Sequence, residues 1–335
     1  METPSDREAV KSFFEMHRRF IVLGHREPDG DCVGSQLVLE TWLERRGKEV
    51  SAVSVGPFDR PEISVYADRF TGRIEPRDVE PGTALVLVDC SGPERTGLGP
   101  ERLASLEALP SLVIDHHAAG RRHGSLHFID PEVPSTTLLV LDLMESMGDE
   151  PTEEEAELLL FGFCTDTGFF RHLSSSQASA LGAVQRLVER GASPREVYRR
   201  IYTGRNLEQF RLLGRLLARV EAYAGGKVLI SWQTLEESTA FGKNLRGSDD
   251  FYRHLQSVSG NELAVLIKEE EDGRCSVGLR STGALNVGEL AHSLGGGGHV
   301  LASGYTEEGS ADQVKARLLE ALSRFYPVTP SSRTA

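Results

Sequence analysis

Short uninterrupted apolar runs alternate with amphipathic segments through the first half of the chain. The runs cover residues 20–23, 84–88 and 111–114, and residues 48–55 alternate between polar and apolar positions. Runs of this length are typical of strands that are buried on both faces of a sheet. A helix-prone segment such as residues 101–109 lies between them, so we expect a parallel sheet with helical crossovers.

Helical patterns then dominate as far as about residue 223. Pro134-Ser135 opens one helix that we expect to reach about Met147, and Pro151-Thr152 followed by three glutamates opens the next. Acidic residues favour the first turn because they face the positive end of the helix dipole. We place the end of this domain near Arg190 and expect residues 193–223 to form a helical connector.

A second, smaller unit is predicted from residue 226 onward. An Asp272-Gly273 turn between two alternating runs is a strong hairpin signal, and Ser310 with Gln313 begins the last helix in a capping-box pattern. We expect residues 221–223 to remain helical and residues 227–232 to form a strand. The predicted fold is α/β, with a larger parallel-sheet domain at 12–190, a helical linker at 191–225, a mixed α/β domain at 226–326 and a disordered tail at 327–335.

Aspartates and histidines follow the predicted strands at their carboxyl ends, where open α/β sheets keep their sites, and Asp166 lies at the end of a predicted helix. No cationic side chain lies between Asp29 and Asp31, so their mutual repulsion favours a metal cation. We expect Pro28 and Gly30 to bend this loop through one rigid and one permissive φ. The candidates are His25, Asp29, Asp31, Asp89, Asp115, His116, His117 and Asp166.

The charges of this set suit two divalent ions better than one. Four aspartates lie outside the Asp-His-His triplet, and two divalent cations neutralise their four charges. Carboxylates favour Mg²⁺ or Mn²⁺, and imidazoles shift the preference towards transition metals. Mn²⁺ is therefore the first choice, with Mg²⁺ or another divalent ion as the alternative. Taken alone, Asp89 would be a turn or helix cap, and only the co-occurrence of the motifs favours a metal site.

Composition narrows the classes of function. The net charge of the 335-residue chain is −13, whereas proteins that grip long duplex nucleic acid usually present a basic surface, so we exclude that partner. The four cysteines form no CxxC pair, which favours reduced thiols. No apolar run approaches the length of a membrane span, so we expect a cytoplasmic protein without membrane contacts. The oligomeric state stays open, with a homodimer among the options.

The order of these motifs resembles that of the DHH phosphoesterase superfamily. The matching segments are His25-x-x-Pro28-Asp29-x-Asp31, Asp89, Asp115-His116-His117 and Thr165-Asp166-Thr167-Gly168. Towards the C-terminus, Arg280-Ser281 and the glycine-rich residues 295–299, followed by Ala302 and Gly304, look like the DHH-associated substrate domain. The length and the two-domain plan are most similar to the NrnA group. That resemblance implies hydrolysis of very short oligoribonucleotides (nanoRNA) and of the 3′-phosphate of 3′-phosphoadenosine 5′-phosphate.

The resemblance also implies roles for the residues. His25, Asp29 and Asp89 would hold one Mn²⁺, and the second would be held by Asp31, Asp89, His116 and Asp166. His117 would face the scissile phosphate with Asp115 supporting it, and a water activated by the two ions would attack phosphorus. The residues expected to bind substrate are Arg280, Ser281, Gly296, Gly297, Gly298, His299 and Arg171. We also expect a helix to start after the glycines and to favour phosphate at its N-terminus.

Other functions remain open at this point. The nearest enzymatic rival is a phosphodiesterase for signalling dinucleotides, such as pGpG or cyclic dinucleotides, and an inorganic pyrophosphatase of the same superfamily is a weaker one. A non-catalytic nucleotide-binding module would need a broken ligand set, and the sequence contains every one of the expected ligands.

Overall fold

The computed structural model describes residues 4–74, 79–90, 92–117, 124–204, 206–241 and 248–326. The chain divides into two compact units, Met1–Gly204 and Arg205–Ala335. The predicted connector is shared between them, because α8 (Pro194–Tyr202) belongs to the first unit and α9 (Leu207–Ala218) to the second. The predicted tail at 327–335 lies outside the described residues.

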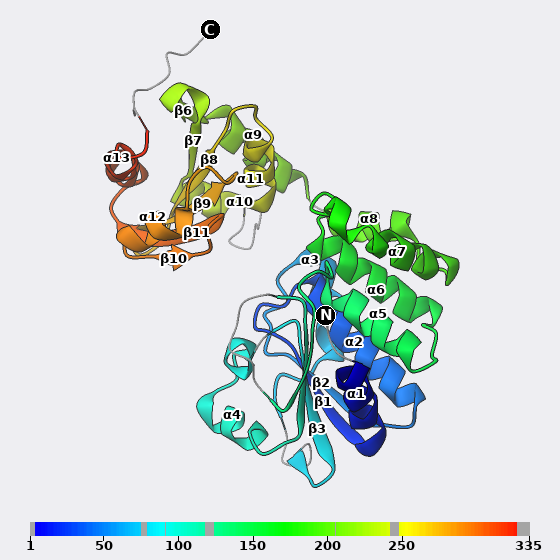
Figure 1. Ribbon diagram of the computed structural model, residues 1–335. Helices are drawn as coiled ribbons and strands as arrows, with labels where there is room; N and C mark the ends of the chain where they lie inside the picture. Colours follow the sequence, from blue (N-terminus) through cyan, green and yellow to red (C-terminus); the bar gives the residue numbers. More distant parts are fainter. Residues whose placement is uncertain are drawn as a thin grey trace. The chain divides into compact units, whose positions relative to one another are not determined.

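The first unit is built on a five-stranded parallel sheet in the order β2-β1-β3-β4-β5 (Figure 1). The strands are β1 (Arg19–Leu23), β2 (Glu49–Val53), β3 (Thr83–Val88), β4 (Ser111–Asp115) and β5 (Leu126–Ile129). Every residue of β3 and β4 is buried, which explains their unbroken apolar sequences. The parallel sheet is confirmed. The sequence did not reveal β5, because this edge strand is short and mostly half-buried.

Helices cover both faces of this sheet. The helices are α1 (Pro4–Met16), α2 (Gly30–Arg45), α3 (Pro61–Ser64), α4 (Pro100–Leu106), α5 (Thr136–Ser146), α6 (Glu153–Asp166) and α7 (Ser179–Glu189). Phe20 and Val22 face the core that α1, α2, α5 and α6 complete, whereas Ile21 and Leu23 face the core on the side of α4. Thr152 and Glu155 form the capping box that starts α6.

The second unit contains a six-stranded mixed sheet in the order β10-β11-β9-β8-β7-β6. The strands are β6 (Glu221–Tyr223), β7 (Val228–Gln233), β8 (Leu263–Glu269), β9 (Arg274–Ser281), β10 (Gly297–Gly298) and β11 (Ala302–Glu308). The Asp272-Gly273 hairpin is confirmed, because β8 and β9 pair antiparallel on either side of it. The prediction of helix at residues 221–223 was wrong: these residues form an edge strand that pairs with β7.

Helices also cover both faces of the second sheet. They are α9, α10 (Leu235–Phe241), α11 (Ser248–Gln256), α12 (Val287–Ser293) and α13 (Ala311–Leu322). Leu266 packs with residues of α9 and α11, whereas Val265 packs with those of α12 and α13. Ser310 and Gln313 make the predicted capping box of α13.

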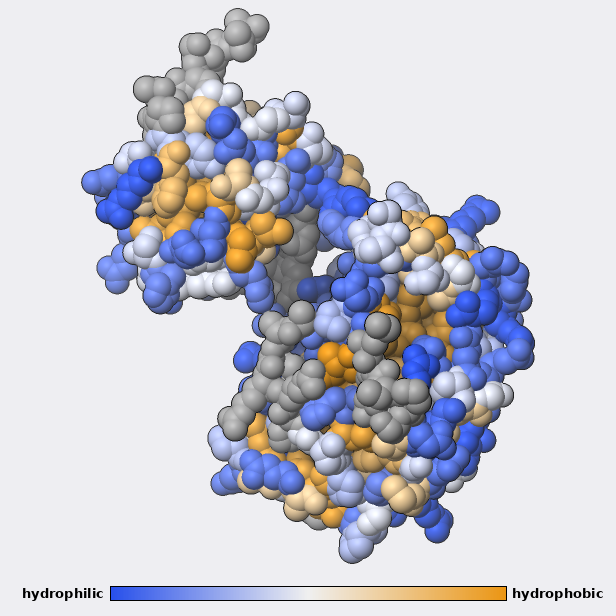
Figure 2. All heavy atoms as spheres, in the orientation of Figure 1, coloured by the Kyte–Doolittle hydropathy of each residue, from blue (hydrophilic) through white to orange (hydrophobic). Residues whose placement is uncertain are grey.

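The surface and the thiols are unremarkable for such a fold. Within the described part of the chain, no helix is both long enough and apolar enough to cross a membrane. All four cysteines are free and buried. The face drawn in Figure 2 mixes hydrophilic and hydrophobic residues on each unit.

Candidate active site

Asp89 lies at the centre of the predicted residues. It follows β3 directly, its side chain is almost wholly buried, and its φ of 56° places it in the left-handed region that few residues other than glycine adopt. Its Oδ2 is 3.5 Å from Nε2 of His25, and its Oδ1 is 3.7 Å from Nε2 of His116. The two carboxylate oxygens of Asp89 therefore face different imidazoles.

Three further aspartates, at the start of one helix and the end of another, lie close to the imidazoles of His25 and His116. Asp29, the N-cap of α2, lies with Oδ1 3.9 Å from Nε2 of His25. Nε2 of His116 lies 3.9 Å from Oδ2 of Asp31 and 3.5 Å from Oδ2 of Asp166, the last residue of α6. The structure thus brings together all six residues that we predicted as metal ligands.

The N-terminus of α5 holds Asp31 in place. The main-chain N–H groups of Thr136 and Thr137 donate to Oδ2 and Oδ1 of Asp31 at 2.6 and 2.9 Å, and the Thr137 hydroxyl donates to Oδ1 at 2.8 Å. The Thr136 hydroxyl donates to Oδ1 of Asp89 at 3.0 Å. Sequence reasoning missed both threonines. The only signal in the sequence was Pro134-Ser135. It marked the start of the helix but did not reveal that this helix start lies against Asp31.

His117 and Asp115 form a tight pair beside this centre. Nδ1 of His117 lies 2.7 Å from Oδ1 of Asp115, and the main-chain N–H of His117 donates to the same oxygen at 3.1 Å. The hydrogen bond that His117 donates to Asp115 is the main reason that the pKa of His117 rises to about 9. His117 Nδ1 is also 3.7 Å from Oδ1 of Asp89, so the pair adjoins the centre.

Burial and mutual repulsion dominate the electrostatics of the carboxyl groups. Burial together with the charge of Asp31 raises the pKa of Asp89 to about 7, and burial with both of these neighbours raises the pKa of Asp166 to about 8. Burial works against ionisation of Asp29 as well, but the bond with His25 outweighs it and lowers the pKa of Asp29 to about 2. Ionised carboxylates this close repel one another, and divalent cations would relieve that repulsion.

The donor atoms fit divalent metals. Among the residues that the structure describes, three groups of side chains each bring their ligand atoms within 4.8 Å of one another: His25, Cys32 and Asp89; Asp89, His116 and His117; Asp31, His116 and Asp166. Nε2 of His116 is buried and has no hydrogen-bond partner among the described residues, as expected of a nitrogen that binds a metal ion. The mixture of carboxylate and imidazole suits ions such as Mn²⁺ or Mg²⁺.

Gly30 has a different role from the one expected. It is the first residue of α2 and does not have a positive φ, so a permissive φ is not what the loop requires. A Cβ atom at this position would lie 2.5 Å from both Cγ2 and Oγ1 of Thr165. Glycine is needed here because α2 and the end of α6 approach closely, which brings Asp31 towards Asp166.

The predicted substrate residue Arg171 lies in the loop after α6. Its side chain is exposed, and its Nη2 donates to Nε2 of His172 at 2.9 Å. The guanidinium group therefore stays accessible, five residues beyond the candidate ligand Asp166.

In the second unit, Arg280 and Gly296 line one pocket of about 660 Å³. The Arg280 guanidinium lies 4.7 Å from the centre of the Tyr252 ring. A Cβ atom on Gly296 would come within 2.2 Å of the carbonyl oxygen of Gly304, so only glycine fits beside β11. Ser281 is 2% exposed, and its hydroxyl accepts hydrogen bonds from the N–H groups of Gly283 and Leu285 at 3.0 and 3.3 Å.

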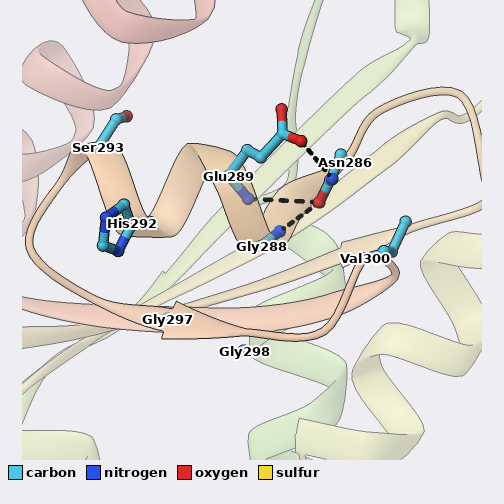
Figure 3. Close-up of a pocket in the computed structure, with 8 residues that line it drawn as sticks. All are labelled: Asn286, Gly288, Glu289, His292, Ser293, Gly297, Gly298 and Val300. Atoms are coloured by element: carbon cyan, nitrogen blue, oxygen red, sulfur yellow. Dashed lines mark hydrogen bonds between the residues drawn. The ribbon is translucent and has the colours of Figure 1, made fainter. Parts of the chain in front are cut away.

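Gly297 and Gly298 line a second pocket of about 510 Å³, shown in Figure 3. The Asn286 side chain caps α12 there by accepting from the N–H groups of Gly288 and Glu289 at 3.1 and 3.3 Å. Our expectation of a helix after the glycines was wrong. The glycines form β10, and β11 follows after a tight turn at His299, whose N–H donates to the carbonyl of Ala302 at 2.7 Å. The helix α12 precedes them instead.

Comparison with known families and relatives identifies the class of this protein as a metal-dependent phosphoesterase, a hydrolase of phosphoester bonds. Residues 19–163 match the model of the DHH family, N-terminal domain, and residues 226–326 match that of the DHHA1 domain. The chain belongs to the DHH family. The resemblance inferred from the motifs is confirmed.

Two curated relatives and one solved structure extend this finding. The bifunctional oligoribonuclease and PAP phosphatase NrnA of Thermus thermophilus is 34% identical over 303 residues, which cover 89% of this chain and 87% of the relative. The cyclic-di-AMP phosphodiesterase PdeA of Listeria monocytogenes is 25% identical over 95% of this chain but only 49% of its own length. An exopolyphosphatase-related protein from Bacteroides fragilis shares the fold, with a TM-score of 0.86 at 23% identity over 97% of each chain.

Proposed function

We propose that this chain is a Mn²⁺-dependent phosphoesterase that hydrolyses very short oligoribonucleotides and the 3′-phosphate of 3′-phosphoadenosine 5′-phosphate. The observation that carries the proposal is the position of Asp89, whose two oxygens face His25 on one side and His116 on the other. Such an aspartate can bridge two ions. The similarity to the NrnA of Thermus thermophilus, over most of both chains, supports the substrate class.

Six residues would hold the ions. His25 and Asp29 would share one ion with Asp89, and the second ion would use Asp89 together with Asp31, His116 and Asp166. When bound, two divalent cations neutralise charge on the phosphate and lower the pKa of a water nucleophile. The threonines at the start of α5 orient Asp31, in the way that outer hydrogen bonds commonly fix ligating carboxylates.

His117 would act on the phosphate itself. The carboxylate of Asp115 accepts a hydrogen bond from Nδ1 of His117. This bond fixes the orientation of the ring and leaves Nε2 for the substrate. The hydrogen bond to Asp115 raises the pKa of His117, which favours the protonated ring that would donate from Nε2 to the substrate. We assign it to a non-bridging phosphate oxygen or to the leaving alkoxide.

The second unit would bind the nucleotide. Arg280 provides a guanidinium at a pocket beside the aromatic ring of Tyr252, and Gly296 lines the same pocket at a position where only glycine fits beside β11. Guanidinium groups bind phosphate through paired hydrogen bonds. We retain His299, Gly297 and Gly298 as candidate contacts at the neighbouring turn.

A second candidate function is hydrolysis of signalling dinucleotides. It is favoured by the similarity to the cyclic-di-AMP phosphodiesterase PdeA, which extends over nearly the whole of this chain. The same two-metal chemistry would cleave either substrate, so only the substrate preference separates the two functions.

One substrate panel distinguishes them. Purified protein with Mn²⁺ would be incubated with 5′-labelled RNAs from dinucleotides to long oligomers, with 3′-phosphoadenosine 5′-phosphate, with pGpG and with cyclic-di-AMP. We expect the highest kcat/KM on the shortest RNAs and on 3′-phosphoadenosine 5′-phosphate. Equal rates at all RNA lengths, or a clear preference for cyclic-di-AMP, would contradict the proposal.

A further inference from the structure

One face of α8 carries alternating cationic and aromatic side chains. Arg195, Tyr198, Arg199 and Tyr202 stand three or four residues apart, so they share one side of the helix. Arg195 and Arg199 are exposed, Tyr198 is 50% exposed, and the rings of Tyr198 and Tyr202 lie 4.8 Å apart. We call these four residues the α8 face.

The opposite side of α8 is the side that anchors the helix. Val197 is fully buried in the core of the first unit. Arg200 donates to Glu157 on α6 at 3.0 Å, and its guanidinium lies 5.4 Å from the centre of the Phe161 ring. The helix α8 lies against α6 (Figure 1). Because this packing already holds α8 in place, its attachment does not depend on the aromatic rings of the α8 face.

Phe169 connects the α8 face to the candidate active site. Its ring lies 5.3 Å from that of Tyr198 and 6.3 Å from that of Tyr202. Phe169 is the third residue after Asp166, so the two Cα atoms are at most about 11 Å apart. The α8 face therefore lies beside the loop that follows the candidate ligand Asp166.

The backbone that presents Phe169 is strained. Phe169 and Phe170 have φ values of 56° and 73°, which bulky side chains rarely adopt. The ring of Phe170 packs 5.3 Å from that of Phe163 in the core, and this packing holds the loop in its unusual conformation. Strain of this kind is concentrated at functional sites. Here it turns Phe169 towards α8.

We propose that the α8 face, together with Phe169, is a stacking surface for the bases of the RNA substrate beyond the nucleotide being cleaved. Every base has a π face, so aromatic side chains bind single strands with little regard to sequence. Arg195 and Arg199 would contact the intervening phosphates, and they place positive charge locally on a chain whose net charge is −13. Arg199 also pairs with Glu196 at 3.0 Å, but an exposed pair of this kind holds an arginine only weakly.

This inference rests on the proposed function and specifies its substrate contacts. It distinguishes a trinucleotide, which has bases to place on the α8 face, from 3′-phosphoadenosine 5′-phosphate, which has only one base. Both substrates would use the same metal centre. Stacking should therefore appear as a length-dependent contribution to binding.

The test compares variants at Tyr198. Tyr198→Leu keeps the apolar bulk but removes the π face, and Tyr198→Phe keeps the ring. Binding of a 5′-fluorescein trinucleotide RNA to the full-length protein in EDTA would be followed by fluorescence anisotropy. We expect Tyr198→Leu to raise Kd about tenfold and Tyr198→Phe to retain most of the wild-type affinity. Leu181→Ala on α7, at a side chain that is 51% exposed, is the control that should bind as the wild type does.

Kinetics with Mn²⁺ and a charge variant add independent readouts. Tyr198→Leu should raise KM for the trinucleotide more than KM for 3′-phosphoadenosine 5′-phosphate. Arg195→Gln should reduce the dependence of trinucleotide binding on salt, because one phosphate contact is lost.

Each remaining outcome overturns the inference. If Tyr198→Leu and the double variant Tyr198→Leu/Tyr202→Leu bind and cleave the trinucleotide as the wild type does, the α8 face is not a binding surface and the proposed function stands. If Tyr198→Phe loses as much affinity as Tyr198→Leu, the hydroxyl rather than stacking makes the contact. If the wild type neither binds nor cleaves the trinucleotide, both proposals fail.

Discussion

Thr137 donates both its main-chain N–H and its hydroxyl to Oδ1 of Asp31, at 2.9 and 2.8 Å. This contact joins α5 to α2 at the candidate metal centre. Because the donors belong to the first turn of α5, the helix dipole adds to the attraction for an ionised carboxylate. The metal-facing geometry of Asp31 thus depends on a helix that contributes none of the proposed ligands.

Loss of the Thr137 hydroxyl should weaken metal binding. Thr137→Val has nearly the same shape but leaves Asp31 with one hydrogen bond fewer. We expect the affinity for Mn²⁺ to fall by about 10- to 100-fold, as for other partners that orient metal ligands. Isothermal titration calorimetry would measure this change, with Thr137→Ser as the control that keeps the hydroxyl. Equal affinity in Thr137→Val and wild type would show that the main-chain donors alone position Asp31.

Asp89→Asn should abolish turnover while the protein stays folded. Asparagine matches aspartate in shape but cannot provide the negative charge that both ions would share. We expect less than about a tenth of the wild-type activity, together with loss of tight Mn²⁺ binding. Activity assays and calorimetry would be combined with circular dichroism to confirm folding. A variant with higher residual activity would contradict a bridging role for Asp89.

Gly30→Ala should destabilise the first unit, because the added Cβ would lie 2.5 Å from two atoms of Thr165. We expect the free energy of unfolding to fall by about 1–3 kcal/mol, measured by urea denaturation. Adding Thr165→Ala removes the two nearest of the three clashing atoms and should restore part of this loss. Gly214→Ala is the matched control, since nothing lies within 4 Å of its Cβ position on α9 and alanine favours a helix. If Gly30→Ala left the free energy of unfolding unchanged, α2 and α6 would have to be able to move apart without cost.

The pair Arg219–Glu237 should make the second unit sensitive to acid. Burial opposes ionisation of Glu237, but the hydrogen bond from Arg219, with Nη1 to Oε2 at 2.8 Å, outweighs it and lowers the pKa of Glu237 below its ordinary value of 4.5. A carboxyl group with a lowered pKa contributes stability above its unfolded pKa, and this stability is lost as pH falls through the folded pKa. The difference in free energy of unfolding between wild type and Glu237→Gln should therefore shrink as the pH is lowered from neutral to below 4.5. Urea denaturation across this range would measure it, and a difference independent of pH would contradict the prediction.

The sequence predicted the strands, and the side chains at their ends, wherever a local pattern of residues is sufficient to define a strand. The apolar runs at β3 and β4 end at Asp89 and at Asp115, so their carboxylates were predictable at the edge of a parallel sheet. Local patterns failed where pairing partners decide the structure. The edge strands β5 and β6 are short, and the glycines at residues 297–298 form a strand only because β11 returns beside them.

The sequence by itself determined which side chains reach the sheet edge, because apolar periodicity places strand ends and the order of the motifs identifies the family. Only the tertiary structure decided how those side chains meet. It set Thr136 and Thr137 against Asp31, required Gly30 for the contact with Thr165, and packed the ring of Phe169 edge-to-face against that of Tyr198. These contacts join elements that are far apart in the chain or turn through unusual φ values. Their formation depends on close packing between elements, and no local pattern of residues encodes that packing.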